Sequence, residues 1–138
     1  GGTIAGIISG LNGAKKIIGI PVLKNNGFLE KEITYFLSLV KKENLDNWKL
    51  INEYSFGGYA KFNTSLIDFI NQFYQQTKIS LDPIYTGKMM FGVFEKIKQG
   101  FFKKDEKILV IHTGGLQGID GMNIALKNKN FNTIQFND

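Results

Sequence analysis

The chain has 138 residues, of which 43% are hydrophobic and 21% charged, and this is ordinary for one soluble domain with a core. The net charge is +5, but all 17 basic residues are lysines, whereas nucleic-acid readers commonly use arginine for bidentate contacts. Cysteine is absent, which excludes disulfides and thiolate metal sites, and no apolar run reaches the roughly 20 residues of a membrane span. We therefore expect a cytoplasmic protein that binds neither nucleic acid nor membrane, and we predict no metal site.

The first half of the chain alternates helical and extended patterns. Apolar residues at helical spacing predict one helix over Ile4–Leu11 and a second over Leu29–Val40. Short apolar runs predict strands at Ile17–Val22 and Trp48–Tyr54. The glycine loop around Gly57-Gly58-Tyr59 follows the second strand.

The second half continues the alternation. Asn63 or Thr64 is expected to cap a third helix, and Thr86 a fourth whose inward face holds Met90, Val93, Phe94 and Ile97 and which ends before Gly100. Ile79–Tyr85 is expected to be extended. The run Ile108–Ile111 predicts a strand over Lys107–His112 that is buried on both faces. A last helical segment should contain Ile119 and Ile124, and the polar tail after Lys127 offers apolar anchors at Phe131, Ile134 and Phe136.

Strands that alternate with helices predict an α/β fold with a mainly parallel sheet flanked by helices, in a single domain over residues 1–138. In such folds ligands bind beyond the C-terminal ends of the strands. Gly57-Gly58-Tyr59, Tyr85-Thr86-Gly87-Lys88 and Thr113-Gly114-Gly115 would all lie at that edge. Short turns also use glycine simply for its positive φ, but several such loops at one edge favour a ligand site.

Gly1-Gly2-Thr3 precedes an apolar helical pattern, as in a loop that binds phosphate at a helix N-terminus. On this hypothesis the strand that should precede the loop is missing, and the chain is the C-terminal part of a larger enzyme. The alternative is a cloning remnant or a loose terminus, where paired glycines are common. The residues alone leave both explanations open.

Three blocks together resemble a known family. They are Leu81-Asp82-Pro83-Ile84-Tyr85-Thr86-Gly87-Lys88-Met89-Met90, then Gly100-Phe101-Phe102, then Ile111-His112-Thr113-Gly114-Gly115. They resemble the C-terminal half of the 1-aminocyclopropane-1-carboxylate deaminase/D-cysteine desulfhydrase family, pyridoxal-phosphate enzymes of the tryptophan-synthase β type. The similarity extends to about Asn123, and Gly1-Gly2-Thr3-Ile4-Ala5-Gly6 resembles the end of the family's phosphate loop.

The resemblance implies a two-domain fold, pyridoxal 5′-phosphate as cofactor, a small amino-acid substrate and a homodimer at full length. It assigns Tyr85 and, less securely, Tyr59 as catalytic residues. It assigns Gly1, Gly2 and Thr3 to the cofactor phosphate and Thr86 to the pyridine nitrogen. No lysine here matches the family's Schiff-base motif, so the chain alone is expected to be inactive. Lys88 is interpreted as an ordinary residue of a first helical turn.

Thr86 also bears on the reaction. Members of the family that open the cyclopropane ring carry glutamate after the motif tyrosine, and this chain has threonine there. The resemblance therefore favours α,β-elimination on a D-amino acid such as D-cysteine. The alternatives are a phosphate- or nucleotide-binding α/β domain with different or no catalysis, and an interaction domain without a ligand. No complete phosphate-loop or dinucleotide motif supports the first alternative.

Overall fold

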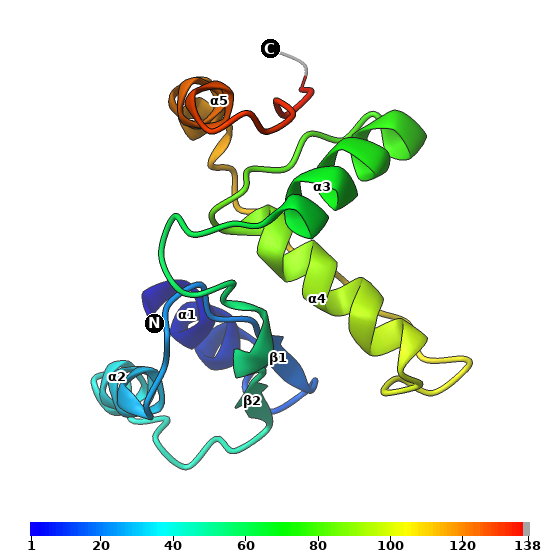
Figure 1. The fold of residues 1–138 in the computed structure, drawn as a ribbon. Helices are drawn as coiled ribbons and strands as arrows, with labels where there is room; N and C mark the ends of the chain where they lie inside the picture. Colours follow the sequence, from blue (N-terminus) through cyan, green and yellow to red (C-terminus); the bar gives the residue numbers. More distant parts are fainter. Residues whose placement is uncertain (137–138) are drawn as a thin grey trace.

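The computed structural model describes residues 1–136 and shows a mixed α/β protein (Figure 1). Two short parallel strands are flanked by helices, so the α/β class is confirmed, although the sheet is much smaller than predicted. In chain order the elements are α1 (Gly2–Leu11), β1 (Ile17–Gly19), α2 (Phe28–Ser38), β2 (Trp48–Leu50), η1 (Asn52–Tyr54), α3 (Thr64–Thr77), α4 (Thr86–Lys98), η2 (Leu116–Gly118) and α5 (Ile119–Asn128).

The first core joins α1, α2 and the sheet. The strands pair in parallel, with Ile17 opposite Trp48, and Ala5, Ile8, Ile33 and Leu37 pack together beside them. Gly19 allows this approach, because a Cβ there would lie 2.6 Å from both Ile4 and Leu50 side chains. α1 and the sheet are thus held together by close apolar packing.

The second core joins α3, α4, α5 and the tail. Its fully buried members include Leu66, Ile70, Leu81 and Leu126. The tail is fastened as predicted: Ile134 is buried, and Phe131 and Phe136 pack against the same core. Asn71 and Asn123 hold the tail backbone by accepting from Gln135 N at 2.8 Å and from Ile134 N at 2.7 Å. The second core therefore does not depend on the sheet.

The helix predictions are largely confirmed. The Asn63 side chain caps α3 by accepting from Leu66 N at 3.0 Å, and Gly100 follows α4 with a φ of 69°. Gly92 lets α4 approach the first half of the chain, since a Cβ there would lie 2.7 Å from Ile20 and 2.8 Å from Tyr54. Within residues 1–136, no helix has both the length and the apolar character needed to cross a bilayer.

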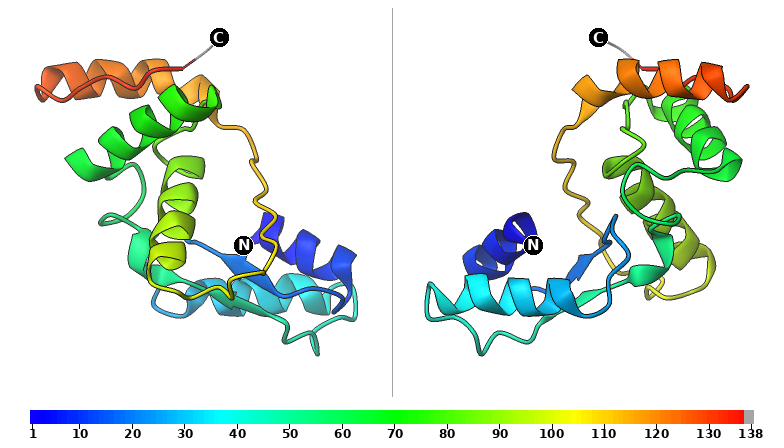
Figure 2. Two further views of the ribbon diagram at one scale, coloured as in Figure 1. Left: turned by 90° about the vertical axis from the view of Figure 1, so that its right-hand side faces the viewer. Right: turned by 60° about the vertical axis from the view of Figure 1, so that its left-hand side comes forward.

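Several strand predictions are wrong. Lys107–His112 forms no strand, and Leu109 is 88% exposed rather than buried on both faces. Figure 2 shows this segment as an extended trace between α4 and α5. The composition suits a strand, but a strand forms only when a neighbour satisfies its backbone hydrogen bonds. Residues 52–54 are a 3₁₀ turn instead of strand, and Ile97 on α4 is half-exposed instead of inward. Ile79–Tyr85, which was expected to be extended, belongs to no helix or strand.

Candidate active site

The start of α4 is organised by one buried carboxylate. Asp82 is 1% exposed and precedes Pro83, whose fixed φ favours a turn. The Asp82 Oδ1 atom accepts from the backbone N–H groups of Ile84 at 2.8 Å and Tyr85 at 2.7 Å. Its Oδ2 atom accepts from Thr86 N at 2.8 Å. Asp82 thus satisfies backbone donors that the first helical turn would otherwise leave unpaired.

Thr86 completes this turn. The prediction that Thr86 caps the helix is wrong. Tyr85 occupies the N-cap position, and Thr86 is the first helical residue. The buried Thr86 hydroxyl donates to Asp82 Oδ2 at 2.6 Å and accepts from Asp82 N at 3.0 Å. A hydroxyl has one hydrogen and two lone pairs, so Thr86 retains only an acceptor position.

The two tyrosines implied by the family resemblance lie together. Their ring centroids are 6.1 Å apart with an interplanar angle of 66°, an edge-to-face arrangement. Tyr85 is 47% exposed and Tyr59 53% exposed. Partial desolvation, the neighbouring Tyr59 hydroxyl and the negative charge of Asp82 raise the pKa of Tyr85. The Tyr85 hydroxyl therefore stays protonated at neutral pH and can act as a donor.

Lys88 is the residue that sequence reasoning missed. Its side chain is fully buried, and Nζ donates to the backbone carbonyls of Ser55 at 2.8 Å and Gly58 at 2.7 Å. Burial lowers the pKa of Lys88 to about 8, against the opposing effect of the Asp82 charge. The available signal was a lone lysine between Gly87 and the apolar pair Met89-Met90, a context that suits a buried, partnered cation better than a solvated one.

The Thr113-Gly114-Gly115 turn lies against the Asp82 turn. Gly115 has a φ of 97°, and a Cβ there would lie 3.0 Å from Asp82 Oδ2. His112 fastens the turn: its Nδ1 accepts from Gly114 N at 3.1 Å, and its Nε2 lies 2.9 Å from the Ser80 carbonyl. Both ring nitrogens are thereby used in shaping the turn. Two blocks of the resemblance, about thirty residues apart in the sequence, are thus neighbours in the fold.

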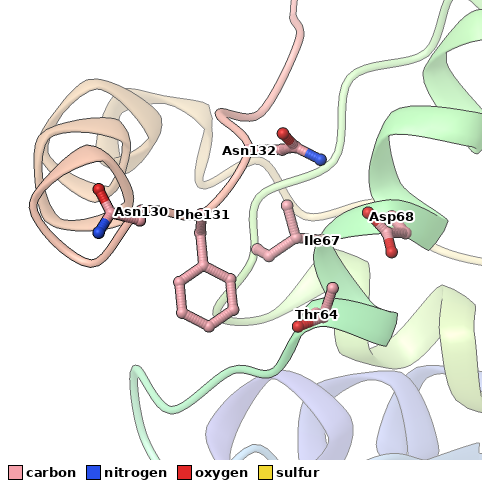
Figure 3. A pocket seen from close by; sticks show the side chains of 6 residues that line it. All are labelled: Thr64, Ile67, Asp68, Asn130, Phe131 and Asn132. Carbon is pink, nitrogen blue, oxygen red and sulfur yellow. The ribbon is translucent and has the colours of Figure 1, made fainter.

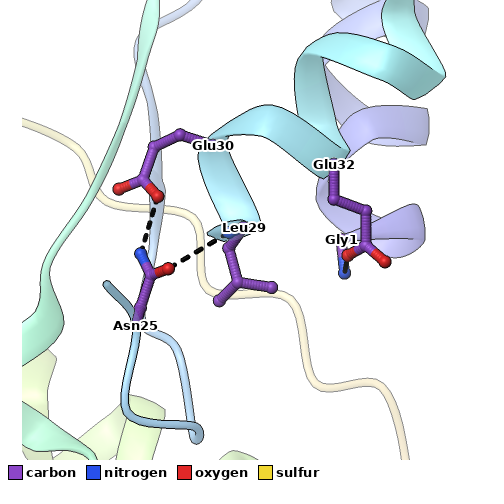
Figure 4. A network of polar contacts seen from close by, with 5 residues as sticks. All are labelled: Gly1, Asn25, Leu29, Glu30 and Glu32. Atoms are coloured by element: carbon purple, nitrogen blue, oxygen red, sulfur yellow. Dashed lines mark hydrogen bonds and ion pairs between the residues drawn. The ribbon is translucent and has the colours of Figure 1, made fainter. Parts of the chain in front are cut away.

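Gly1, Gly2 and Thr3 belong to a different element, the exposed start of α1. Figure 4 shows Gly1 there, beside Glu32 of α2. No atom outside the local backbone lies within 4 Å of a Cβ built on Gly2, whereas a Cβ on Gly1 would meet the Glu32 side chain. The Gly1 amino group lies 2.9 Å from the Glu32 carboxylate of α2. Asn25 braces the start of α2 by accepting from Leu29 N at 3.1 Å and donating to Glu30 at 2.7 Å. An anion at the start of α1 would have to share that end with the Glu32 charge.

A separate hollow of about 220 Å³ lies between α3 and the tail (Figure 3). It is lined by side chains from both: Thr64, Ile67, Asp68, Asn130, Phe131 and Asn132. None of the residues predicted for the site lines it. In residues 1–136 no three His, Asp or Glu side chains gather as metal ligands would.

No protein-family profile matches the chain, but curated proteins do. A Pyrococcus furiosus protein, named provisionally as a 1-aminocyclopropane-1-carboxylate deaminase, is 36% identical over 86% of this chain. A Klebsiella pneumoniae D-cysteine desulfhydrase is 32% identical over 83%, and a Bradyrhizobium diazoefficiens 1-aminocyclopropane-1-carboxylate deaminase is 28% identical over 93%. The chain spans only 37%, 37% and 41% of the lengths of these three relatives.

The predicted resemblance to the 1-aminocyclopropane-1-carboxylate deaminase/D-cysteine desulfhydrase family is therefore confirmed. Some relatives are named as deaminases and others as desulfhydrases, and both kinds match most of this chain. Similarity by itself therefore does not distinguish the two activities.

Proposed function

We propose that this chain forms part of a pyridoxal-phosphate-dependent lyase that acts on a small D-amino acid. The Tyr59–Tyr85 pair carries the proposal, because it brings two half-exposed tyrosines together at the start of α4. Tyr85 belongs to a block that resembles the family. The whole protein is proposed to be a cytoplasmic homodimer.

We propose that two places hold the cofactor and its substrate. The start of α1 would offer the backbone N–H groups of Gly2 and Thr3 to a phosphate, which would share that end with the Glu32 carboxylate. The tyrosine pair offers groups that can hold a substrate amine or move a proton. When bound, pyridoxal phosphate supplies the electron sink for carbanion chemistry at the substrate.

Tyr85 is the proposed acid–base group. Because its pKa is raised, it remains a hydrogen-bond donor over the neutral range and becomes a base only when another group accepts its proton. Tyr59 is positioned to hold the Tyr85 ring and to contact the same ligand.

Thr86 underlies the choice of reaction. A carboxylate at this position would favour a protonated pyridine nitrogen, which makes the cofactor ring a strong electron sink, whereas a hydroxyl would not. Donation by Thr86 to that nitrogen also requires it to release its 2.6 Å bond to Asp82. A weaker sink suffices when a thiol leaves from the β-carbon. We therefore favour α,β-elimination, in which D-cysteine and one water give pyruvate, ammonia and sulfide.

The test is an assay of the enzyme that contains this chain, loaded with pyridoxal phosphate. D-cysteine and 1-aminocyclopropane-1-carboxylate are supplied separately. Sulfide and pyruvate report turnover of D-cysteine, and 2-oxobutyrate reports opening of the cyclopropane ring. Faster turnover of D-cysteine supports the proposal. Faster opening of the cyclopropane ring would refute the choice of reaction, and no turnover of either would favour the alternative of a phosphate-binding domain.

A further inference from the structure

A strained loop presents Tyr59 to Tyr85. Phe56, Gly57 and Gly58 have φ angles of 54°, 97° and 126°, three successive residues in a region that L side chains rarely adopt. For Phe56 such a conformation costs free energy, and it persists only when its surroundings hold it in place. Within the loop, one hydrogen bond from Gly58 N to the Ser55 carbonyl, at 3.0 Å, closes the turn.

Lys88 supplies the external support. Its Nζ atom donates to the carbonyls of Ser55 and Gly58, the residues at the two ends of the strained stretch. The Gly58 carbonyl belongs to the peptide unit that continues directly into Tyr59. On the other side, Lys88 is three residues after Tyr85, one turn into α4. One side chain therefore connects the backbone of one tyrosine to the helix of the other.

The chemistry of the contact requires a side chain with several hydrogen-bond donors. The ammonium has three donors and no acceptor, which suits two converging carbonyls. An apolar side chain of similar length would leave both carbonyls without this buried donor. Because Lys88 is 0% exposed and bonded to both carbonyls, it is not placed to attack a carbonyl ligand.

We propose that Lys88 is a positioning residue, which clamps the 55–59 loop to α4 and thereby holds Tyr59 against Tyr85. The inference rests on the proposed function for its catalytic consequence, but its structural consequence can be measured separately.

The test compares Lys88→Met with Lys98→Met in the intact enzyme. Lys98 lies on the same helix, is 69% exposed and pairs with the nearby Glu95, so its variant is the matched control. The first readout is the contact between the Tyr59 and Tyr85 rings, followed by nuclear Overhauser effects with selectively labelled tyrosine. The second is kcat against KM with cofactor bound.

Lys88→Met is expected to remove the ring–ring signal and to lower kcat at least tenfold, with KM changed much less, because small misplacements of reacting groups are costly. Lys88→Arg, which keeps the charge and donors, should recover part of both. Lys98→Met should change neither. A retained ring–ring signal in folded Lys88→Met would overturn the inference.

A second variant covers the case in which Lys88→Met does not fold. Gly58→Ala strains the same loop through its backbone, because the φ of 126° is one that alanine rarely adopts. The added Cβ itself would meet no atom within 4 Å. It should displace Tyr59 and lower kcat in the same direction. An unchanged ring contact and kcat in Gly58→Ala would equally overturn the inference. If instead Tyr85→Phe and Tyr59→Phe leave turnover unchanged, the proposed function fails while the ring contact still tests the clamp.

Discussion

The turn at residues 82–88 buries polar side chains, whereas the segment at residues 107–112 exposes apolar ones. In the turn, Asp82, Thr86 and Lys88 are buried and each makes hydrogen bonds. In the segment, Ile108, Leu109 and Ile111 are exposed and lack a strand partner. A turn closed by its own side chains can form locally, whereas a strand depends on a neighbour elsewhere in the protein.

The largest expected difference in stability is between alanine variants of two leucines, one beside the turn and one in the exposed segment. Leu81→Ala removes a fully buried side chain and should lower the free energy of unfolding by about 2–5 kcal/mol. Leu109→Ala removes a side chain that is 88% exposed and should change it by less than about 0.5 kcal/mol. Urea unfolding followed by circular dichroism measures both. Equal losses would show that residues 107–112 are packed after all.

The pH dependence of stability isolates Lys88. Its folded-state pKa of about 8 lies below the value of 10.5 expected when unfolded, so the unfolded chain binds more protons between these values. Stability should therefore rise from pH 8 to 10.5, by up to about 3 kcal/mol from this residue. The difference between the wild-type and Lys88→Met profiles isolates that contribution. Parallel profiles would mean that Lys88 titrates as it does in water.

Two aspartates test the capped turn. Asp82→Ala leaves three backbone N–H groups and the Thr86 hydroxyl without their acceptor, and should cost about 2 kcal/mol or more. Asp105→Ala, at an exposed position near the extended segment, should be nearly neutral. Thermal unfolding of both variants checks this. A neutral Asp82→Ala would contradict the role given to its carboxylate.

Two helical glycines are expected to change stability in opposite directions. A Cβ at Gly87 would lie 2.6 Å from both the Asp82 carbonyl oxygen and Ile70, so Gly87→Ala should destabilise by about 1–3 kcal/mol. A Cβ added at Gly121 in α5 would meet no atom within 4 Å outside its own helix backbone, so Gly121→Ala should stabilise by about 0.5–1 kcal/mol. Opposite signs in urea unfolding are expected. Destabilisation by both would show that glycine has another role in α5.

The same contrast explains which predictions succeeded. The helices, the Asn63 cap and the position of Gly100 follow from local patterns, and all are observed. The strand at Lys107–His112 failed because β pairing is a property of two segments. Thr86 was predicted as the cap because threonine commonly caps helices, but its hydroxyl is engaged by Asp82, accepting from Asp82 N and donating to Asp82 Oδ2.

The candidate site was predictable only in part. The family resemblance identified Tyr59 and Tyr85, and the structure places their rings together. It also implied cofactor contacts for Gly1, Gly2, Thr3 and Thr86, which stay predictions. The clamp by Lys88 was not predictable, because it depends on two carbonyls some thirty residues earlier in the chain.

The central claim is that the tyrosine pair performs proton chemistry, and Tyr85→Phe tests it most directly. The change removes one hydroxyl from a half-exposed ring and keeps the packing against Tyr59. In the intact enzyme with cofactor bound, kcat for D-cysteine should fall at least tenfold, within the contribution of about 10²–10⁴-fold typical of such groups. Wild-type turnover by this variant, with cofactor still bound, would show that Tyr85 only packs and would contradict the account.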